Sequence, residues 1–410
     1  MRIAIKTLGC KLNQYETQLM IEDLTKEGHQ IVDFDESAHL YIVNSCAVTA
    51  KASKESRLLA KSAAKRGRVV YTGCDSYLEE KLKDRFILAG NSHKYRMAEF
   101  IKNPSSDISD ATKTYPINRT LSQYTQKSRA FVKIQEGCDN HCTYCIIPFL
   151  RGRQRDKDRD AVLSEIKGLV RAGFSEIVLT GTNIGSYRDF KGLLRDIDAL
   201  EGDFRVRISS IEPMYVDEEV VGIVSNGRFA KHLHIPLQSG SDAILRLMGR
   251  DYKKQQYEKI ANQCHRMGIF LGCDIIVGFF GETDELFEET YGFVKDLPLS
   301  YAHVFSYSKR PNTPAYNLRL ELPRGPVVRE RNRRLRELFE KKKKDSIEQM
   351  IGKTVEFVIE TTRVKTQHGE FYKGITSQYF PVLVDKYRDG LKKGILKKFD
   401  GRFGYVEWAE

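Results

Sequence analysis

The residues with the clearest chemical meaning are three cysteines on one short segment, Cys138, Cys142 and Cys145. Three thiolates at this spacing can ligate three irons of a [4Fe-4S] cube and leave the fourth iron without a protein ligand. An open iron can chelate the amino and carboxylate groups of S-adenosylmethionine (SAM), and an electron from the cluster can then cleave an S–C bond of SAM. The segment therefore predicts chemistry through a 5′-deoxyadenosyl radical.

The alternative for these cysteines is a zinc site, with His141 or a distant side chain as the fourth ligand. Structural zinc more often uses two paired knuckles than one segment of three cysteines, so we favour the iron–sulfur cluster. The zinc site stays as the alternative from another functional class, a non-catalytic zinc protein that binds RNA.

A second set of cysteines is spread over the first part of the chain. Cys10, Cys46 and Cys74 each stand just past a short apolar run that predicts a strand. The carboxyl ends of parallel strands meet at one edge of a sheet, so the three thiols can meet there. Gly9 and Gly73 directly precede two of them and permit a tight turn. The pattern predicts a second three-cysteine cluster, with three unrelated buried thiols as the alternative.

The elements that must position these cysteines follow from the hydrophobic pattern. In residues 1–100, apolar runs alternate with helical patterns at 15–28 and 50–66, which is typical of a parallel βαβ sheet. A polar stretch at residues 102–116 predicts a linker. Six further candidate strand runs, separated mostly by helical segments, then predict an open or partial (β/α)6 barrel with its reactive site at the carboxyl ends of the strands. The six runs span residues 131–134, 176–180, 205–209, 232–237, 272–278 and 302–307.

A doubly wound open sheet is the alternative for this central part. After a basic helix at residues 329–344, short alternating strands predict a small β-barrel. A chain of 410 residues also exceeds what one core usually organises. The sequence therefore predicts an α/β fold in three domains, at residues 1–112, 124–347 and 348–410.

Charge and composition limit which partners the protein is expected to have. The net charge is +12, and residues 321–410 hold 21 Lys and Arg against 14 Asp and Glu. A localised basic excess is typical of a phosphate-bearing partner, although a solvated helix face explains the basic helix equally well. No apolar run approaches the roughly 20 residues of a membrane span, so we expect a cytoplasmic protein with no membrane partner. Eight cysteines in that compartment indicate metal or catalysis rather than disulfides, with Cys264 and Cys273 structural.

Four segments together resemble the radical SAM methylthiotransferase family. They are residues 7–16 (TLGCKLNQYE), 43–49 (VNSCAVT), 72–74 (TGC) and 138–153 (CDNHCTYCIIPFLRGR). The resemblance covers essentially the whole chain, including a C-terminal segment similar to a TRAM domain, the small RNA-binding barrel of this family. Within the family the segments are most similar to the threonylcarbamoyladenosine tRNA methylthiotransferases.

The resemblance implies two [4Fe-4S] clusters and SAM as cofactors. Cys138, Cys142 and Cys145 would carry the radical-generating cluster, and the second set the auxiliary cluster that delivers the methylthio sulfur; no catalytic residue beyond the clusters is expected. One SAM supplies the methyl group and another the radical that abstracts hydrogen from C2 of adenine. The implied substrate is N6-threonylcarbamoyladenosine beside the anticodon, in a tRNA anticodon stem-loop. Isopentenyladenosine in tRNA and a ribosomal protein are the alternatives, and we expect a monomer served by an external electron donor.

SAM contacts are expected at the strand ends of the barrel, where glycines permit close approach and hydroxyls can bond a carboxylate or ribose. Ordinary turn chemistry explains each residue alone about as well. The candidates are Thr180, Gly181, Thr182, Asn183, Ser209, Ser210, Gln238, Ser239, Asp274 and Gly278. The segment at 180–183 departs from the Gly-Gly-Glu pattern common in radical SAM enzymes.

RNA contacts are expected after the cysteine segment and in the C-terminal barrel. Arg151, Arg153, Arg155 and Arg159 can position an anticodon stem-loop through its phosphates, with a solvated arginine-rich loop as the alternative. Lys373 lies beside aromatic residues that can stack on bases or belong to the core. Those aromatics are Phe371, Tyr372 and Tyr379.

Overall fold

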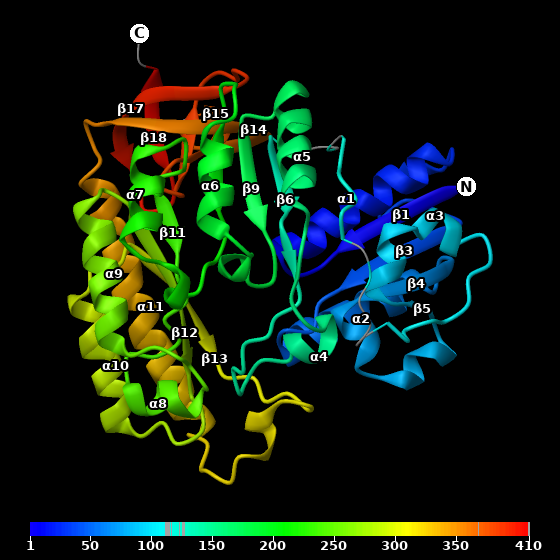
Figure 1. The fold of residues 1–410 in the computed structure, drawn as a ribbon, viewed down its shortest axis with the longest axis horizontal. Helices are drawn as coiled ribbons and strands as arrows, with labels where there is room; N and C mark the ends of the chain where they lie inside the picture. Colours follow the sequence, from blue (N-terminus) through cyan, green and yellow to red (C-terminus); the bar gives the residue numbers. More distant parts are fainter. Residues whose placement is uncertain (111–114, 116, 123, 125–127, 368, 409–410) are drawn as a thin grey trace.

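The computed structural model describes residues 1–110, 115, 117–122, 124, 128–367 and 369–408. Figure 1 shows three parts: an N-terminal sheet in blue and cyan, a central barrel in green and yellow, and a small C-terminal barrel in orange and red. The predicted α/β fold class, with parallel sheets followed by a small β-structure, is confirmed.

The N-terminal sheet is entirely parallel, in the order β2-β1-β3-β4-β5. The two edge strands have only three residues each, which is why the sequence pattern missed them. The helix after β1 begins at Lys11 rather than at residue 15, because the extended Cys10 is its N-cap. The strands are β1 (Arg2–Thr7), β2 (Gln30–Val32), β3 (Leu40–Ser45), β4 (Arg68–Gly73) and β5 (Ile87–Ala89), and the helices α1 (Lys11–Lys26), α2 (Ala50–Ala63) and α3 (Met97–Phe100).

The predicted linker at residues 102–116 is packed onto this sheet as far as it is described. The Asp107 N–H donates to Leu88 O and the Gly90 N–H donates to Asp107 O, both at 2.8 Å, so Asp107 extends the edge beyond β5. Residues 111–114 and 116, with the predicted boundary at 112, lie outside the described residues.

The central part consists of two parallel three-stranded sheets, β10-β9-β6 and β11-β12-β13. Isolated parallel bridges, Val206 to Phe229 and Ser210 to His234, join β10 to the segment of β11. The six strands therefore form one open barrel, as predicted, and each overlaps its predicted run. Their bounds are β6 (Arg129–Lys133), β9 (Glu176–Thr180), β10 (Arg205–Ile208), β11 (His232–His234), β12 (Phe270–Val277) and β13 (Tyr301–Ser306).

Helices cover the outside of this barrel, as Figure 1 shows. Side chains alternate between the two faces of a strand, and on β12 the outward set, including Leu271, Cys273 and Ile275, is fully buried in the main hydrophobic core. The helices are α5 (Arg159–Arg171), α6 (Phe190–Asp198), α7 (Glu218–Asn226), α8 (Asp242–Leu247), α9 (Lys254–Arg266), α10 (Asp284–Asp296) and α11 (Gly325–Glu348). Polar residues on the opposite face of the strands are thereby directed into the lumen.

The C-terminal barrel is closed, in the order β14-β15-β16-β18-β17. It sits over the amino ends of the central strands, as Figure 1 shows. Arg205 donates to Ile375 O at 2.8 Å and Arg207 donates to Thr376 O at 2.8 Å, while Glu176 pairs with both guanidiniums. The strands are β14 (Thr354–Thr366), β15 (Gly369–Thr376), β16 (Pro381–Val384), β17 (Leu391–Phe399) and β18 (Gly404–Trp408). This clamp closes one end of the lumen, so Cys138, Cys142 and Cys145, which follow the carboxyl end of β6, face the other.

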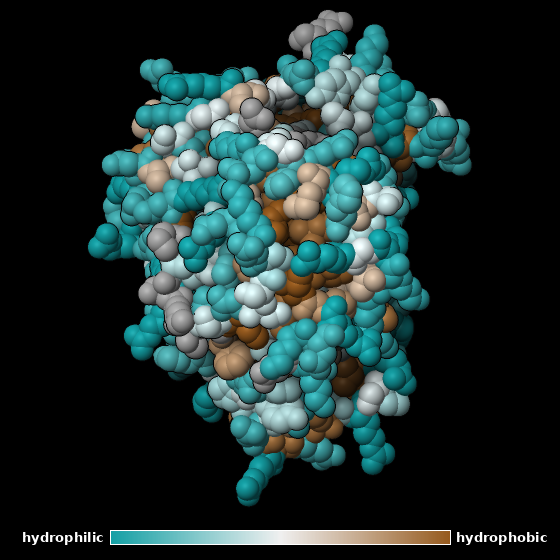
Figure 2. Space-filling view, turned by 90° about the vertical axis from the view of Figure 1, so that its right-hand side faces the viewer, coloured by the Kyte–Doolittle hydropathy of each residue, from teal (hydrophilic) through white to brown (hydrophobic). Residues whose placement is uncertain are grey.

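On the face on the side of the N-terminal sheet, hydrophilic residues dominate around a central strip of apolar residues, as Figure 2 shows. Within the described ranges, no helix combines the length and the apolarity that crossing a bilayer requires.

Candidate active site

The first cysteine set lies on the loop after β6 and the short strand β7 (Gln135–Glu136). Gly137 has φ +72°, and a Cβ there would stand 2.0 Å from Arg153 O, so only glycine lets the loop double back at this point. The Cys138 N–H donates to Gly152 O at 3.1 Å and closes the loop. All three thiols of the set are half-buried.

The three thiols of this set influence one another's ionisation. Burial, together with the neighbouring thiols of Cys142 and Cys138, raises the pKa of Cys145 to about 12. Arg250 Nη1 donates to Cys142 Sγ at 3.0 Å and pairs with Glu212, which favours the thiolate that a metal requires. The sequence analysis named neither Arg250 nor Glu212. Glu212 stands just past β10, where site residues are expected, whereas nothing in the sequence marks Arg250.

The second cysteine set lies at the carboxyl edge of the N-terminal sheet. Cys10 follows β1, Cys46 follows β3 and Cys74 follows β4. A Cβ on Gly9 would stand 2.7 Å from Cys46 Cβ, so Gly9 allows the two turns to touch. Burial, together with the nearby thiols of Cys74 and Cys10, raises the pKa of Cys46 to about 11. The Cys10 side chain is exposed to solvent, yet desolvation by the surrounding protein raises the pKa of its thiol.

A short helix, α4 (Ile147–Arg151), joins the two sets. Ile146 and Leu150 pack with Cys74 and Ala47 in one small hydrophobic cluster. Figure 1 shows α4 between the central barrel and the N-terminal sheet. Because α4 starts two residues after Cys145 and contacts Cys74, the two sets are neighbours across this helix.

Arg151, at the end of α4, corrects the predicted RNA surface. It is 3% exposed, and its guanidinium pairs with Glu16 at 2.8 Å and Glu136 at 2.7 Å and donates to Asn13 Oδ1 at 2.7 Å. Burial alone would raise the pKa of Glu16, but Arg151 and the buried lysines beside it hold that pKa well below its usual range. The prediction that Arg151 contacts RNA is therefore wrong: it ties α1 to the cysteine loop.

The other predicted RNA contacts differ in accessibility. Arg153 is exposed and forms no ion pair with the described residues. Arg155 is half-buried, with its guanidinium 4.4 Å from the ring centroid of Tyr115. Arg159 pairs with two aspartates, and Lys373 pairs with a glutamate of β14 at 3.2 Å. Arg153 is the member of this group best placed for a phosphate.

The predicted SAM contacts after β9 lie beside the first cysteine set. Gln135 Oε1 accepts from the N–H groups of Thr182 at 2.9 Å and Asn183 at 2.7 Å, three residues before Cys138. A Cβ on Gly181 would stand 2.8 Å from Gln135 O, so this turn needs glycine. Thr182 Oγ1 and both amide atoms of Asn183 are buried without a hydrogen-bond partner among the described residues. Such atoms cost free energy, so they indicate a polar ligand here; Thr180 is buried at the strand end.

The remaining predicted SAM contacts divide into two groups. Ser209 is buried and Ser210 exposed at the end of β10, and Gln238, with φ 65°, has a buried Oε1 without a partner in the described chain. Ser239 instead shares a hydrogen bond with a threonine of α10, and the Gly278 N–H donates to a glutamate at 2.9 Å. Ser239 and Gly278 therefore serve internal contacts, whereas Gln238 keeps polar capacity for a ligand.

A group of histidines lines the lumen on β11 and β13. His234 Nε2 lies 3.0 Å from Asp274 Oδ1, its Nδ1 lies 3.1 Å from the Tyr301 hydroxyl, and His232 Nε2 lies 2.8 Å from the same hydroxyl. Both ring nitrogens of His234 are thus engaged. Sequence reasoning named Asp274 but missed the histidines, because their shared face becomes visible only in the barrel register.

A compact group of three potential metal ligands lies in the lumen rather than among the cysteines. Within the described ranges, His234, Asp274 and His303 have all their ligand atoms within 4.8 Å of one another.

At the closed end of the lumen, Tyr379 brings three parts of the chain together. Its ring centroid is 4.7 Å from that of His232, 4.9 Å from the Arg207 guanidinium and 5.8 Å from Lys11 Nζ. Burial, together with the positive charges of Arg207 and Arg129, lowers the pKa of Lys11 to about 8. Sequence reasoning gave Lys11 no role of its own.

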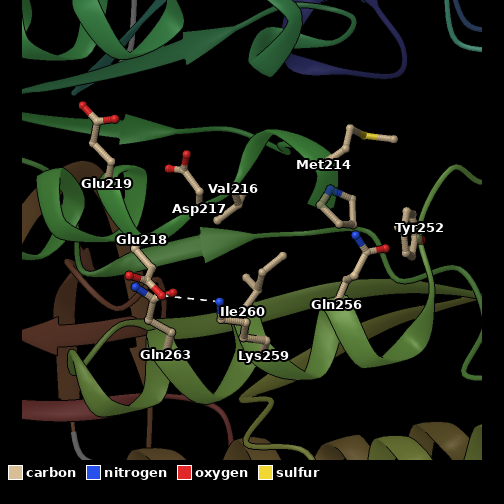
Figure 3. A pocket seen from close by; sticks show the side chains of 11 residues that line it. Met214, Val216, Asp217, Glu218, Glu219, Tyr252, Gln256, Lys259, Ile260 and Gln263 are labelled. Atoms are coloured by element: carbon tan, nitrogen blue, oxygen red, sulfur yellow. Dashed lines mark ion pairs between the residues drawn. The ribbon is translucent and has the colours of Figure 1, made fainter.

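A different pocket, of about 530 Å³, opens on the outside of the barrel between α7 and α9 (Figure 3). Its wall includes Asp217, Glu218 and Glu219, and Glu218 pairs with Lys259 at 3.5 Å. No cysteine lines it, and its carboxylates repel phosphates. It is therefore not the place where a nucleic acid meets the thiols.

Comparison with known families matches both cysteine-bearing regions. The Radical SAM superfamily matches residues 132–294, and the family described as "Uncharacterized protein family UPF0004" matches residues 2–88. Each match contains all three cysteines of one set.

Relatives extend the match over most of the chain. The chain is 36% identical to the threonylcarbamoyladenosine tRNA methylthiotransferase MtaB of Aquifex aeolicus, over 90% of this chain and 95% of the relative. It is 34% identical to the protein of the same name from Bacillus subtilis, over 95% and 92%. Among solved structures, the radical SAM methyltransferase TsrM of Kitasatospora setae has a TM-score of 0.61 at 16% identity, over 77% of this chain and 73% of that one, which is a likeness of fold.

Proposed function

We propose, since the chain belongs to the methylthiotransferase family of radical SAM enzymes, that it converts N6-threonylcarbamoyladenosine in tRNA to its 2-methylthio derivative. The observation that carries the proposal is the meeting of two three-cysteine sets across α4, in a chain 36% identical to a threonylcarbamoyladenosine tRNA methylthiotransferase. The target is the adenosine beside the anticodon, in an anticodon stem-loop. The protein works in the cytoplasm as a monomer that receives electrons from an external donor.

The residues fit the groups that this activity requires. Cys138, Cys142 and Cys145 would hold one [4Fe-4S] cluster, and the second set would hold the other, because the thiols of each set lie close enough to raise one another's pKa. When bound, the clusters and SAM supply a 5′-deoxyadenosyl radical, a methyl group and the sulfur. Replacing the C2–H bond of adenine lies beyond ordinary acid–base chemistry, which is why the chain presents six thiols rather than an acid and a base.

Side chains around the first set prepare a SAM site. Arg250 donates to Cys142 Sγ and stabilises the thiolate form of that ligand. Thr182, Asn183 and Gln238 hold buried polar atoms without partners in the described chain, and these can bond the carboxylate, amino or ribose groups of SAM. Ser209 and Ser210 directly follow β10, so they belong to the same set of strand ends.

The RNA has to present an unstacked base to the region between the two sets, as base-modifying enzymes generally require. Arg153 is exposed on the loop that carries the first set, so it can position a phosphate of the stem-loop. Lys373 and the aromatic residues of the C-terminal barrel are candidates for a second RNA contact. Such contacts set the register of the RNA without reading its sequence.

Reconstituted enzyme tests the proposal directly. The purified chain, loaded anaerobically with iron and sulfide, is incubated with SAM, a chemical reductant and a stem-loop RNA carrying N6-threonylcarbamoyladenosine, and the nucleosides are analysed by mass spectrometry. We expect the 2-methylthio nucleoside with the wild type and none with Cys142→Ala or Cys74→Ala. Product only from isopentenyladenosine RNA or from a ribosomal protein, or a purified protein with zinc and no iron, would overturn the proposal.

A further inference from the structure

Lys11 stands out among the charged residues of the lumen because no carboxylate of the described chain pairs with it. Its ammonium forms no hydrogen bond and no ion pair there, and its nearest recorded contact is the face of Tyr379, 5.8 Å from the ring centroid. The neighbouring cations are already paired. Arg129 bonds Glu360 at 3.0 Å, and Arg207 bonds Glu176 at 3.0 Å.

Lys11 also lines a pocket of about 350 Å³ between α1, β6 and β14. Phe131 and Tyr379 give this pocket aromatic walls, and Arg129 adds a second cation. The ammonium thus lies beside an open space next to Arg129, and the one carboxylate that lines this space, Glu360, is paired with Arg129 and Lys373 rather than with Lys11. A cation held in this way is suited to an anion that arrives with a ligand.

The position of Lys11 along the chain fixes which part of a substrate it can meet. It directly follows Cys10, a residue of the second cysteine set, and begins α1. The sulfur joins C2 of adenine, so C2 has to lie beside that set. In adenine, C2 and C6 both flank N1, so the substituent on N6 projects from the same edge of the ring as C2. The phosphates lie on the opposite side of the nucleotide, beyond the ribose.

We propose that Lys11 binds the carboxylate of the threonylcarbamoyl group and so selects adenosines with an acidic N6 substituent over those with an apolar one. This inference rests on the proposed function and names the group that its substrate site recognises. The carboxylate is the only anion on that edge of the nucleoside. A charge-assisted contact in a partly desolvated pocket is strong, and it distinguishes the acid from a neutral analogue of the same shape.

The test compares two stem-loop RNAs, one with N6-threonylcarbamoyladenosine and one in which its carboxylate is converted to the methyl amide. Holoenzyme is assayed for kcat/KM on both, as wild type, Lys11→Met, Lys11→Arg and the control Lys26→Met, which changes an exposed lysine at the other end of α1. We expect the wild type, Lys26→Met and, in large part, Lys11→Arg to prefer the acid. For Lys11→Met, kcat/KM on the acid falls about 10- to 100-fold and the preference disappears.

Within one variant, the ratio of kcat/KM on the acid RNA to kcat/KM on the amide RNA is unaffected by a general loss of folded or cluster-loaded enzyme. The iron content of each variant checks cluster loading separately. If Lys11→Met keeps the wild-type ratio, the inference is overturned while the proposed function stands. If it weakens binding of an unmodified stem-loop as much as that of the acid, Lys11 contacts a phosphate and the inference is overturned. If the wild type itself fails to act on the acid RNA, the proposed function fails, and the inference fails with it.

Discussion

Replacing Arg151 by methionine separates a structural role from an RNA-binding one. The buried network around it contains two carboxylates, Glu16 and Glu136, and three cations, Arg151, Lys94 and Lys133. Removing one partner of a buried ion pair usually costs about 3–5 kcal/mol. Here two cations still face two carboxylates, so we expect the lower end, a loss of about 3 kcal/mol in the free energy of unfolding.

Arg153→Met is the matched control, because Arg153 lies two residues away on the same loop and is exposed. We expect it to change the free energy of unfolding by less than about 0.5 kcal/mol and to weaken stem-loop binding instead. Anaerobic denaturant unfolding followed by circular dichroism gives the first quantity, and fluorescence anisotropy with labelled RNA gives the second.

The double variant Arg151→Met/Glu16→Gln sharpens the result. Removing the facing negative charge restores part of the lost stability, with a coupling free energy of about 1 kcal/mol or more. If Arg151→Met unfolds like the wild type and loses only RNA affinity, the assignment of Arg151 to the interior network is refuted.

Four further variants test other parts of the account. Cys74→Ser is expected to halve the bound iron, from about eight to about four irons per chain, whereas Cys264→Ser leaves the metal analysis unchanged. Gly73 has φ +95°, and Gly73→Ala would place a Cβ 2.4 Å from a backbone oxygen. The variant should therefore lose more than about 1 kcal/mol in the free energy of unfolding, seen as a lower midpoint of denaturant unfolding, and bind less iron. Arg250→Met removes a positive charge beside the first set, so a redox titration should show its cluster potential lowered by tens of millivolts. Burial would raise the pKa of Glu176, but the arginines beside it lower that pKa. The ionised Glu176 therefore stabilises the fold at pH 7, and this stabilisation is lost as the pH falls below about 4. Thermal unfolding should show that the difference in melting temperature between the wild type and Glu176→Gln shrinks in that range.

Much of the fold follows from local patterns. The strands β6, β9 and β12 overlap their predicted runs because each is a largely buried and largely apolar segment. In β10 and β11 apolar side chains alternate with arginine or histidine, and β13 is mostly not buried. The edge strands β2 and β5 were missed, since three residues carry too little periodicity to be recognised. The start of α1 was placed too late because Cys10 is an N-cap without the usual side-chain hydrogen bond.

The candidate site likewise has residues that the sequence predicts and residues that it does not. Strand ends with cysteines can be recognised from the chain alone, because carboxyl ends of parallel strands share an edge. The burial of Arg151 and the isolation of Lys11 could not be recognised, because each depends on which distant side chains surround it. Arg151 meets Glu16 from a helix more than a hundred residues earlier, and Lys11 meets Tyr379 from the C-terminal barrel. An arginine-rich sequence looks alike whether it faces water or a buried carboxylate.

Nucleoside mass spectrometry of total tRNA tests the central claim most directly. Cells that lack the gene are compared with cells that carry it, and with cells rescued by Cys142→Ala or Cys74→Ala. The account predicts that 2-methylthio-N6-threonylcarbamoyladenosine disappears and its unthiolated precursor accumulates in the deletion strain and in both variants, while the wild-type gene restores the methylthio form. An unchanged profile in a strain without a second such gene would contradict it.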